Sequence, residues 1–105
     1  MKVRVLINEW KKCPKAFRLR LLQYWRDFFQ KEESYCLVKN CSENSKLTAA
    51  LVCNEHDEVG VVPMCTSHAS EYEKLELEYY AHVLSADRIE GEVPAKLRHL
   101  FSPNE

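Results

Sequence analysis

The first 31 residues hold two patterns of apolar and polar positions, and each predicts one element. Residues 2–7 alternate with a period of two, which predicts a short β-strand with one side formed by Val3, Val5 and Ile7. Residues 8–13 show no regular period and are interpreted as a connector, and Pro14 suits the first turn of a helix.

Residues 15–31 have the helical period. Their apolar side chains fall within an arc of roughly 160° at about 100° per residue; they are Phe17, Leu21, Leu22, Tyr24, Trp25, Phe28 and Phe29. The pattern predicts an amphipathic helix with a wide buried face. The alternative is that Leu22, Trp25 and Phe29, at the edge of the arc, belong to a partner or dimer surface, because five aromatic side chains on one helix are many for a small core.

The middle of the chain predicts a β-hairpin followed by a helix. Residues 47–53 and 59–62 are short apolar runs joined by a polar connection, and Pro63 is expected to end the second strand. A second helix is expected from residue 66 or 67 to about residue 85, with His68 on the same side as a stripe of Tyr72, Leu75, Tyr79 and Val83. A turn at 87–91 and a short helix from Pro94 to Phe101 would follow, the latter docking through Leu97, Leu100 and Phe101.

Length and composition indicate one α+β domain over residues 1–105. It divides into an N-terminal strand and basic amphipathic helix (1–34), a central unit (35–85), and a C-terminal turn and short helix (86–105). No apolar run approaches the roughly 20 residues that span a bilayer, and the N-terminus does not resemble a signal peptide. We therefore expect a cytoplasmic protein without membrane contact.

The net charge of −1 conceals an uneven distribution. Residues 1–31 carry nine basic and two acidic side chains, whereas residues 32–105 carry six basic and fourteen acidic ones. The basic part predicts either a phosphate partner or attraction between the two parts of the chain. The candidate nucleic-acid-binding residues are Lys11, Lys12, Lys15, Arg20 and Arg26.

Five cysteines are an odd number, and this favours metal binding over a closed set of disulfides. Structural zinc usually takes four Cys or His ligands as two close pairs. The sequence offers Cys36 with Cys41 before the hairpin and Cys65 with His68 after it. These four are the predicted ligands of a structural Zn²⁺ ion. A further pair, Cys53 and His56, remains as an alternative set of ligands.

The matching segments Cys36-Leu-Val-Lys-Asn-Cys41, Ala50-Leu-Val52 and Val62-Pro-Met-Cys-Thr-Ser-His68 resemble the treble-clef zinc fingers. More narrowly, residues 35–85 resemble the zinc-stabilised branch of the HNH endonuclease-like proteins. The resemblance implies a zinc knuckle, a β-hairpin and a helix that donates the last two ligands. In that family a His at the end of the first strand activates water, and a His or Asn after the last zinc ligand helps to bind the catalytic metal. Leu51 and Ala69 stand at these places, so we expect no nuclease activity and no catalytic residues.

The sequence therefore predicts a non-catalytic, zinc-stabilised binding module, a small regulator or inhibitor that acts on a protein partner, for example a nucleic-acid enzyme. The predicted partner surface consists of Trp10, Arg18, Leu22, Trp25 and Phe29, because Trp and Arg dominate interface energetics. A homodimer through the N-terminal helix is a related prediction. The alternatives are a nucleic-acid-binding zinc finger and a metal-dependent nuclease of the HNH type.

Overall fold

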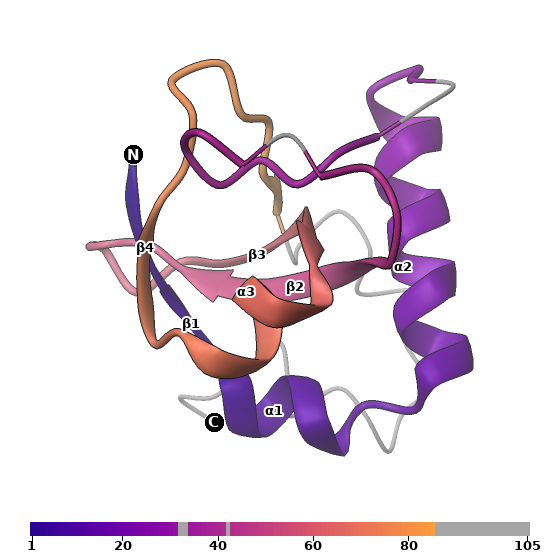
Figure 1. Ribbon diagram of the computed structural model, residues 1–105, viewed down its shortest axis with the longest axis horizontal. Coiled ribbons are helices and arrows are strands. Elements are labelled where there is room, and N and C mark those ends of the chain that lie inside the picture. The colour runs from indigo at the N-terminus through magenta and orange to yellow at the C-terminus, as the bar shows by residue number, and fades with distance from the viewer. Residues whose placement is uncertain (32–33, 42, 86–105) are drawn as a thin grey trace.

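The computed structural model describes residues 1–31, 34–41 and 43–85, and within this part of the chain it contains three helices and five strands (Figure 1). In chain order the elements are β1 (Lys2–Val5), α1 (Ile7–Lys12), α2 (Lys15–Phe28), β2 (Leu47–Cys53), β3 (Val59–Cys65), α3 (Thr66–Glu71), β4 (Lys74–Glu76) and β5 (Leu84–Ser85). The predicted α+β fold with a central hairpin is confirmed.

All five strands form one antiparallel sheet in the order β4-β1-β2-β3-β5. Its centre is the β2–β3 hairpin, whose register runs from the pair Leu47 and Cys65 to the pair Cys53 and Val59. Both strands are buried along almost their whole length. A strand buried on both faces reads as a continuous apolar run, and this explains why these two segments do not alternate in sequence.

The helices pack against the hairpin. Helix α2 stands along one side of it and contacts both strands, while α3 lies across the front of β2 and β3 and also contacts α1 (Figure 1). Four of the seven side chains in the predicted apolar arc are buried: Phe17, Leu21, Leu22 and Trp25. Tyr24 and Phe29 are partly buried, and Phe28 is 51% exposed, so the buried face is narrower than the pattern predicts. Side chains from β1, α2, β2 and β3 therefore share one core.

Two local predictions before and within the hairpin are wrong. Residues 8–13 are not an irregular connector, because α1 occupies Ile7–Lys12 and buries Trp10. Pro63 does not end the second strand, which continues to Cys65. The carbonyl of Pro63 accepts a hydrogen bond from the amide of Leu37, away from β2. Since the N–H and C=O of a residue in an antiparallel strand point to the same side, the missing N–H of Pro63 removes no bond to β2.

The predicted long helix over residues 66–85 is also wrong. Helix α3 ends at Glu71, Tyr72 is extended, and the chain then forms β4 and β5. Strand β4 pairs with β1, and β5 pairs with β3, so these residues cover two edges that the hairpin and β1 would otherwise leave open. The signal for β4 is the alternation of Leu75 and Leu77 with charged neighbours, which has a period of two.

The predicted turn at 87–91 and helix from Pro94 to Phe101 lie outside the described residues. Among the residues that are described, no helix has the length and apolar character needed to cross a membrane.

Candidate metal centre

Two of the predicted ligands lie on the loop that precedes the hairpin. The amide of Cys36 donates to the carbonyl of Glu43 (2.7 Å), which folds the loop back, and the amide of Cys41 donates to the carbonyl of Val38 (3.0 Å). Asn40, just before the second ligand, has a φ of 67°. Asn tolerates this left-handed conformation better than most residues, so the sequence suits a tight knuckle here.

The other two ligands lie where β3 meets α3. Cys65 is the last residue of β3 and precedes the first residue of α3, and His68 lies in the first turn of that helix. The amide of Thr66 donates to the carbonyl of Lys46, so the end of β3 is held to the start of β2 (3.1 Å). The pairing of β3 with β2 therefore fixes the directions of the Cys65 and His68 side chains.

The four side chains converge. The Sγ atoms of Cys36, Cys41 and Cys65 and a ring nitrogen of His68 all lie within 4.8 Å of one another. Nδ1 of His68 is 3.1 Å from Sγ of Cys65 and 3.5 Å from Sγ of Cys36. A tetrahedral zinc ion would place a sulfur and a nitrogen ligand about 3.5 Å apart and two sulfur ligands about 3.8 Å apart. The four atoms therefore fit a metal ion after shifts of up to about 1 Å, in which the more distant pairs approach and Sγ of Cys65 and Nδ1 of His68 move apart by about 0.4 Å.

Burial shapes the chemistry of this cluster. Cys36 and Cys65 are buried, and Cys41 and His68 are partly buried. Burial raises the pKa of the Cys36 thiol to about 12, although backbone hydrogen bonds from Cys65 and Val38 act in the opposite direction. A thiolate here therefore needs a positive charge beside it, which a bound cation supplies. Three thiol groups and one imidazole are soft donors of the kind that bind zinc.

The alternative ligands Cys53 and His56 do not join this cluster. Cys53 is buried at the end of β2 and its Sγ donates to Oδ1 of Asp57 (3.8 Å), whereas the side chain of His56 is 74% exposed and lies 3.7 Å from the carboxylate of Glu55.

None of the five cysteines, all of which the structure describes, forms a disulfide. Burial raises the pKa of Cys13 to about 11, so this thiol is protonated at neutral pH.

The places of the expected catalytic groups are apolar and closed. Leu51 lies in the middle of β2 and Ala69 lies in α3, and both are buried.

The residues predicted to contact a partner fall into two groups. Trp10, Leu22 and Trp25 are buried in the core of this chain. Arg18 and Phe29 are partly exposed, and the guanidinium of Arg18 lies 4.0 Å from the centre of the Trp10 ring. The predicted surface is thus reduced to these two residues, to which the half-exposed Leu19 on the same helix can be added. The basic candidates Lys11, Lys12, Lys15 and Arg20 are exposed, and Arg26 is partly exposed.

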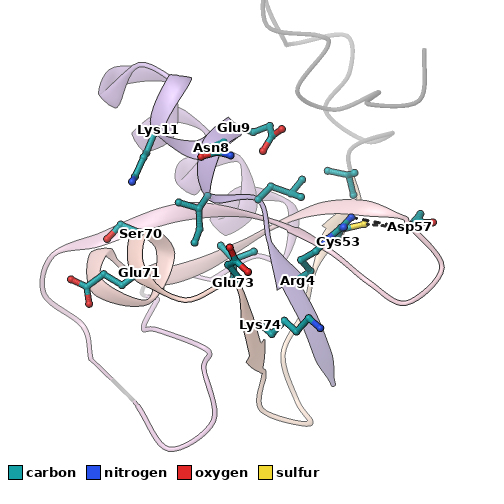
Figure 2. A pocket seen from close by; sticks show the side chains of 14 residues that line it. Arg4, Asn8, Glu9, Lys11, Cys53, Asp57, Ser70, Glu71, Glu73 and Lys74 are labelled. Atoms are coloured by element: carbon teal, nitrogen blue, oxygen red, sulfur yellow. Dashed lines mark hydrogen bonds and ion pairs between the residues drawn. The ribbon is translucent and has the colours of Figure 1, made fainter.

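A cleft of about 720 Å³, which the sequence does not indicate, lies between β1, α1, α3 and β4 (Figure 2). Acidic and basic side chains both line it, including Glu9, Lys11, Glu71 and Lys74. Arg4 on its wall is paired with Asp57 at 3.9 Å. The mixture of charges gives the cleft no preference for an anion or a cation, and we assign no ligand to it.

Comparison with known proteins gives no relative: no family model, curated protein or solved structure matches the chain. The HNH-like resemblance therefore rests on the residues themselves.

Proposed function

We propose that this chain is a zinc-stabilised, non-catalytic binding module, a small regulator or inhibitor that acts on a protein partner. The observation that carries the proposal is the convergence of Cys36, Cys41, Cys65 and His68 between a knuckle and the start of a helix. Such a site contributes on the order of 10 kcal/mol to folding, which is comparable to the whole stability of a small domain. The ion holds the fold together and leaves the surface free for binding.

The absence of catalysis is part of the proposal. Zinc with four protein ligands has no open position for water, in contrast to a catalytic zinc, which keeps one. Leu51 and Ala69 are apolar and buried where the HNH-like resemblance places a base and a metal ligand. Incubation of the purified protein with duplex and single-stranded DNA and Mg²⁺ or Mn²⁺ tests this point. We expect no cleavage, and cleavage that is lost on His56→Ala would instead support the nuclease alternative.

The proposed partner surface consists of Arg18 and Leu19 on α2 and Phe29 directly after it; Leu19 is 49% exposed, and Arg18 and Phe29 are partly exposed. Affinity capture from the source cell at low and high salt tests it. We expect a protein that remains bound at high salt, because apolar contacts are not screened, and that is lost with Leu19→Glu. Gln23→Ala is the matched control, since Gln23 is exposed on the same helix and its side chain donates to Oδ1 of Asp27, one turn away (2.9 Å). A captured partner that is unaffected by Leu19→Glu would contradict the proposed surface.

A further inference from the structure

The candidate metal centre contains three thiol groups that differ in their access to solvent. Cys41 is partly exposed on the loop before the hairpin, whereas Cys36 is 2% exposed and Cys65 is 8% exposed. The three Sγ atoms lie within 4.8 Å of one another. A small oxidant therefore reaches the sulfur of Cys41 first, and two further sulfurs lie close to it.

Metal ligation makes these thiols nucleophilic. A cysteine binds zinc as the thiolate, and the thiolate is also the form that attacks a peroxide. An accessible thiolate with a second cysteine beside it is the typical target of reversible oxidation. Cys41 meets both conditions in the metal-loaded protein, because it is partly exposed and the other two sulfurs are ligands of the same ion.

The two cysteines outside the cluster are protected from this reaction. Cys13 is 2% exposed, and burial raises the pKa of its thiol to about 11, so it keeps its proton at neutral pH. Cys53 is 3% exposed, and its Sγ donates to Oδ1 of Asp57 (3.8 Å). Oxidation of the folded protein is therefore directed to the metal cluster.

Two features favour Cys36 over Cys65 as the second sulfur of a disulfide with Cys41. Cys65 is held in β3 by its pairing with Leu47, whereas Cys36 and Cys41 lie on one loop outside the helices and strands, and a loop adjusts more easily than a paired strand.

The second feature is the separation of the cysteines along the chain. Residues 36–41 form a loop of six residues, and residues 41–65 form a loop of 25 residues. Since the probability of closing a flexible loop falls with about the 3/2 power of its length, the shorter loop closes about eightfold more readily. The two sulfurs have to approach by up to about 2.8 Å, because they lie within 4.8 Å and a disulfide bond is about 2.0 Å long.

We propose that the cluster is a reversible, peroxide-sensitive switch in which oxidation joins Cys36 to Cys41. The thiolate of Cys41 attacks one oxygen of hydrogen peroxide, the O–O bond breaks, and a sulfenic acid and a hydroxide ion result. The thiolate of Cys36 then attacks the sulfur of Cys41 and displaces a second hydroxide as the S–S bond forms. The two thiolates together lose two electrons, the peroxide gains them, and two protons from solvent convert the hydroxides into water.

The disulfide removes two of the four ligands, and Cys65 and His68 alone are too few for a structural zinc site. Since the folding of a small zinc-stabilised domain depends on its ion, the oxidised chain loses its fold and its binding surface. The switch rests on the metal site of the proposed function and adds regulation to it. The module binds its protein partner under reducing conditions and releases it when peroxide accumulates.

The test treats the zinc-loaded Cys13→Ala, Cys53→Ala double variant, which keeps only the three thiols of the cluster, with hydrogen peroxide. We expect the thiol count after denaturation to fall from three to one, with loss of the zinc ion and a mass decrease of about 2 Da for the two hydrogens removed. Peptide mapping should find Cys36 joined to Cys41 and a free thiol at Cys65. Dithiothreitol and Zn²⁺ should then restore the metal content and the circular dichroism spectrum.

Two further proteins serve as controls. Wild type should lose zinc at the same rate as the double variant, because Cys13 and Cys53 take no part in the reaction. Cys41→His replaces the accessible thiolate with an imidazole, which is a zinc ligand but forms no disulfide. It should bind zinc and lose it to peroxide at least about tenfold more slowly, since the remaining thiolates are buried. The disulfide map of the double variant decides the proposal even if Cys41→His does not fold.

Three results overturn the proposal. The first is retention of zinc under conditions that oxidise free cysteine in the same solution. The second is a disulfide that includes Cys65, or release of zinc from Cys41→His at the wild-type rate. The third is oxidation to sulfinic or sulfonic acids that dithiothreitol does not reverse, which would indicate damage.

The zinc content before peroxide is added separates this proposal from the proposed function. A chain that binds no zinc refutes the metal site and the switch together. A zinc-loaded chain that resists peroxide refutes the switch alone.

Discussion

The chain contains the pattern Cys-x-x-His twice, and the two copies have different structures. Cys65 and His68 lie at the join of β3 and α3, and both side chains face Cys36. Cys53 and His56 lie at the tip of the β2–β3 hairpin, where the thiol is buried and the imidazole is exposed. The second copy therefore does not join the cluster of Cys36, Cys41, Cys65 and His68.

This difference arises from the backbone that carries each copy. In the first turn of a helix, residues three apart lie on one side, so Cys65 and His68 point the same way. At the hairpin tip the chain reverses: the amide of Asn54 donates to the carbonyl of Glu58 (3.1 Å), and Asp57 has a φ of 60°. The reversal directs neighbouring side chains apart. The Cys-x-x-His spacing thus forms half of the candidate metal site only in the copy at the start of α3, which lies beside the pair of Cys36 and Cys41.

The largest difference between the two copies is expected when the cysteine of each is replaced. Cys65→Ser should abolish metal binding and the cooperative thermal transition, because the site contributes on the order of 10 kcal/mol to a small domain. Cys53→Ala should keep one bound zinc per chain and lower the melting temperature by only a few degrees. Elemental analysis and circular dichroism measure the two effects. Equal metal content in wild type and Cys65→Ser would refute the proposed site.

The pH dependence of metal binding is a second test of the comparison, with a smaller expected effect. Burial raises the pKa of Cys36 to about 12, so this thiol holds its proton at neutral pH until a metal displaces it. Metal binding therefore releases protons, and lowering the pH weakens it, by up to about tenfold per pH unit for each thiol that must lose a proton. Competition with a chelator between pH 8 and pH 5 measures this slope. His56→Ala should leave the slope unchanged, since His56 is not among the ligands.

The smallest expected effect concerns the hydrogen bonds that hold the hairpin tip. Oδ1 of Asn54 accepts from the amides of His56 (2.8 Å) and Glu58 (3.0 Å). Asn54→Ala should lower the free energy of unfolding by about 1–2 kcal/mol without a change in zinc content. Denaturant unfolding measures it, with the exposed Asn44→Ala as the control. A loss of zinc in Asn54→Ala would mean that the tip supports the site after all.

Sequence reasoning works best where one local pattern decides the structure. The period of α2 and the two apolar runs of the hairpin predict their elements, because burial of a face or of a whole strand leaves a direct trace in the order of residues. The ligand set is predictable for a similar reason, since tetrahedral zinc demands four soft donors in two pairs. What brings the pairs together is the register of the hairpin, in which Leu47 pairs with Cys65, and two continuous apolar runs do not specify that register.

The segment after α3 shows where such reasoning fails. Tyr72, Leu75, Tyr79 and Val83 have helical spacing, yet they form no helix. Leu75 lies in β4, which covers the edge that β1 would otherwise leave unpaired, and Tyr79 lies in a turn. The alternation around Leu75 indicates a strand, but its pairing depends on a strand some seventy residues earlier, which the local pattern does not identify. A pocket lined by Trp25, Tyr35 and Tyr80 could not be predicted from the sequence for the same reason, since these residues meet only after the chain has folded.

The position of β1 between β2 and β4 has a consequence for how the protein is made. Strand β1 is synthesised before both of its partners, and it can pair only when Val52 and, later, Lys74 have been added to the chain. Until then its apolar side chains, Val3 and Val5, have no sheet to join. The sheet can therefore be completed only after β4 has been synthesised, and β1 remains an unpaired apolar strand while the residues between them are added.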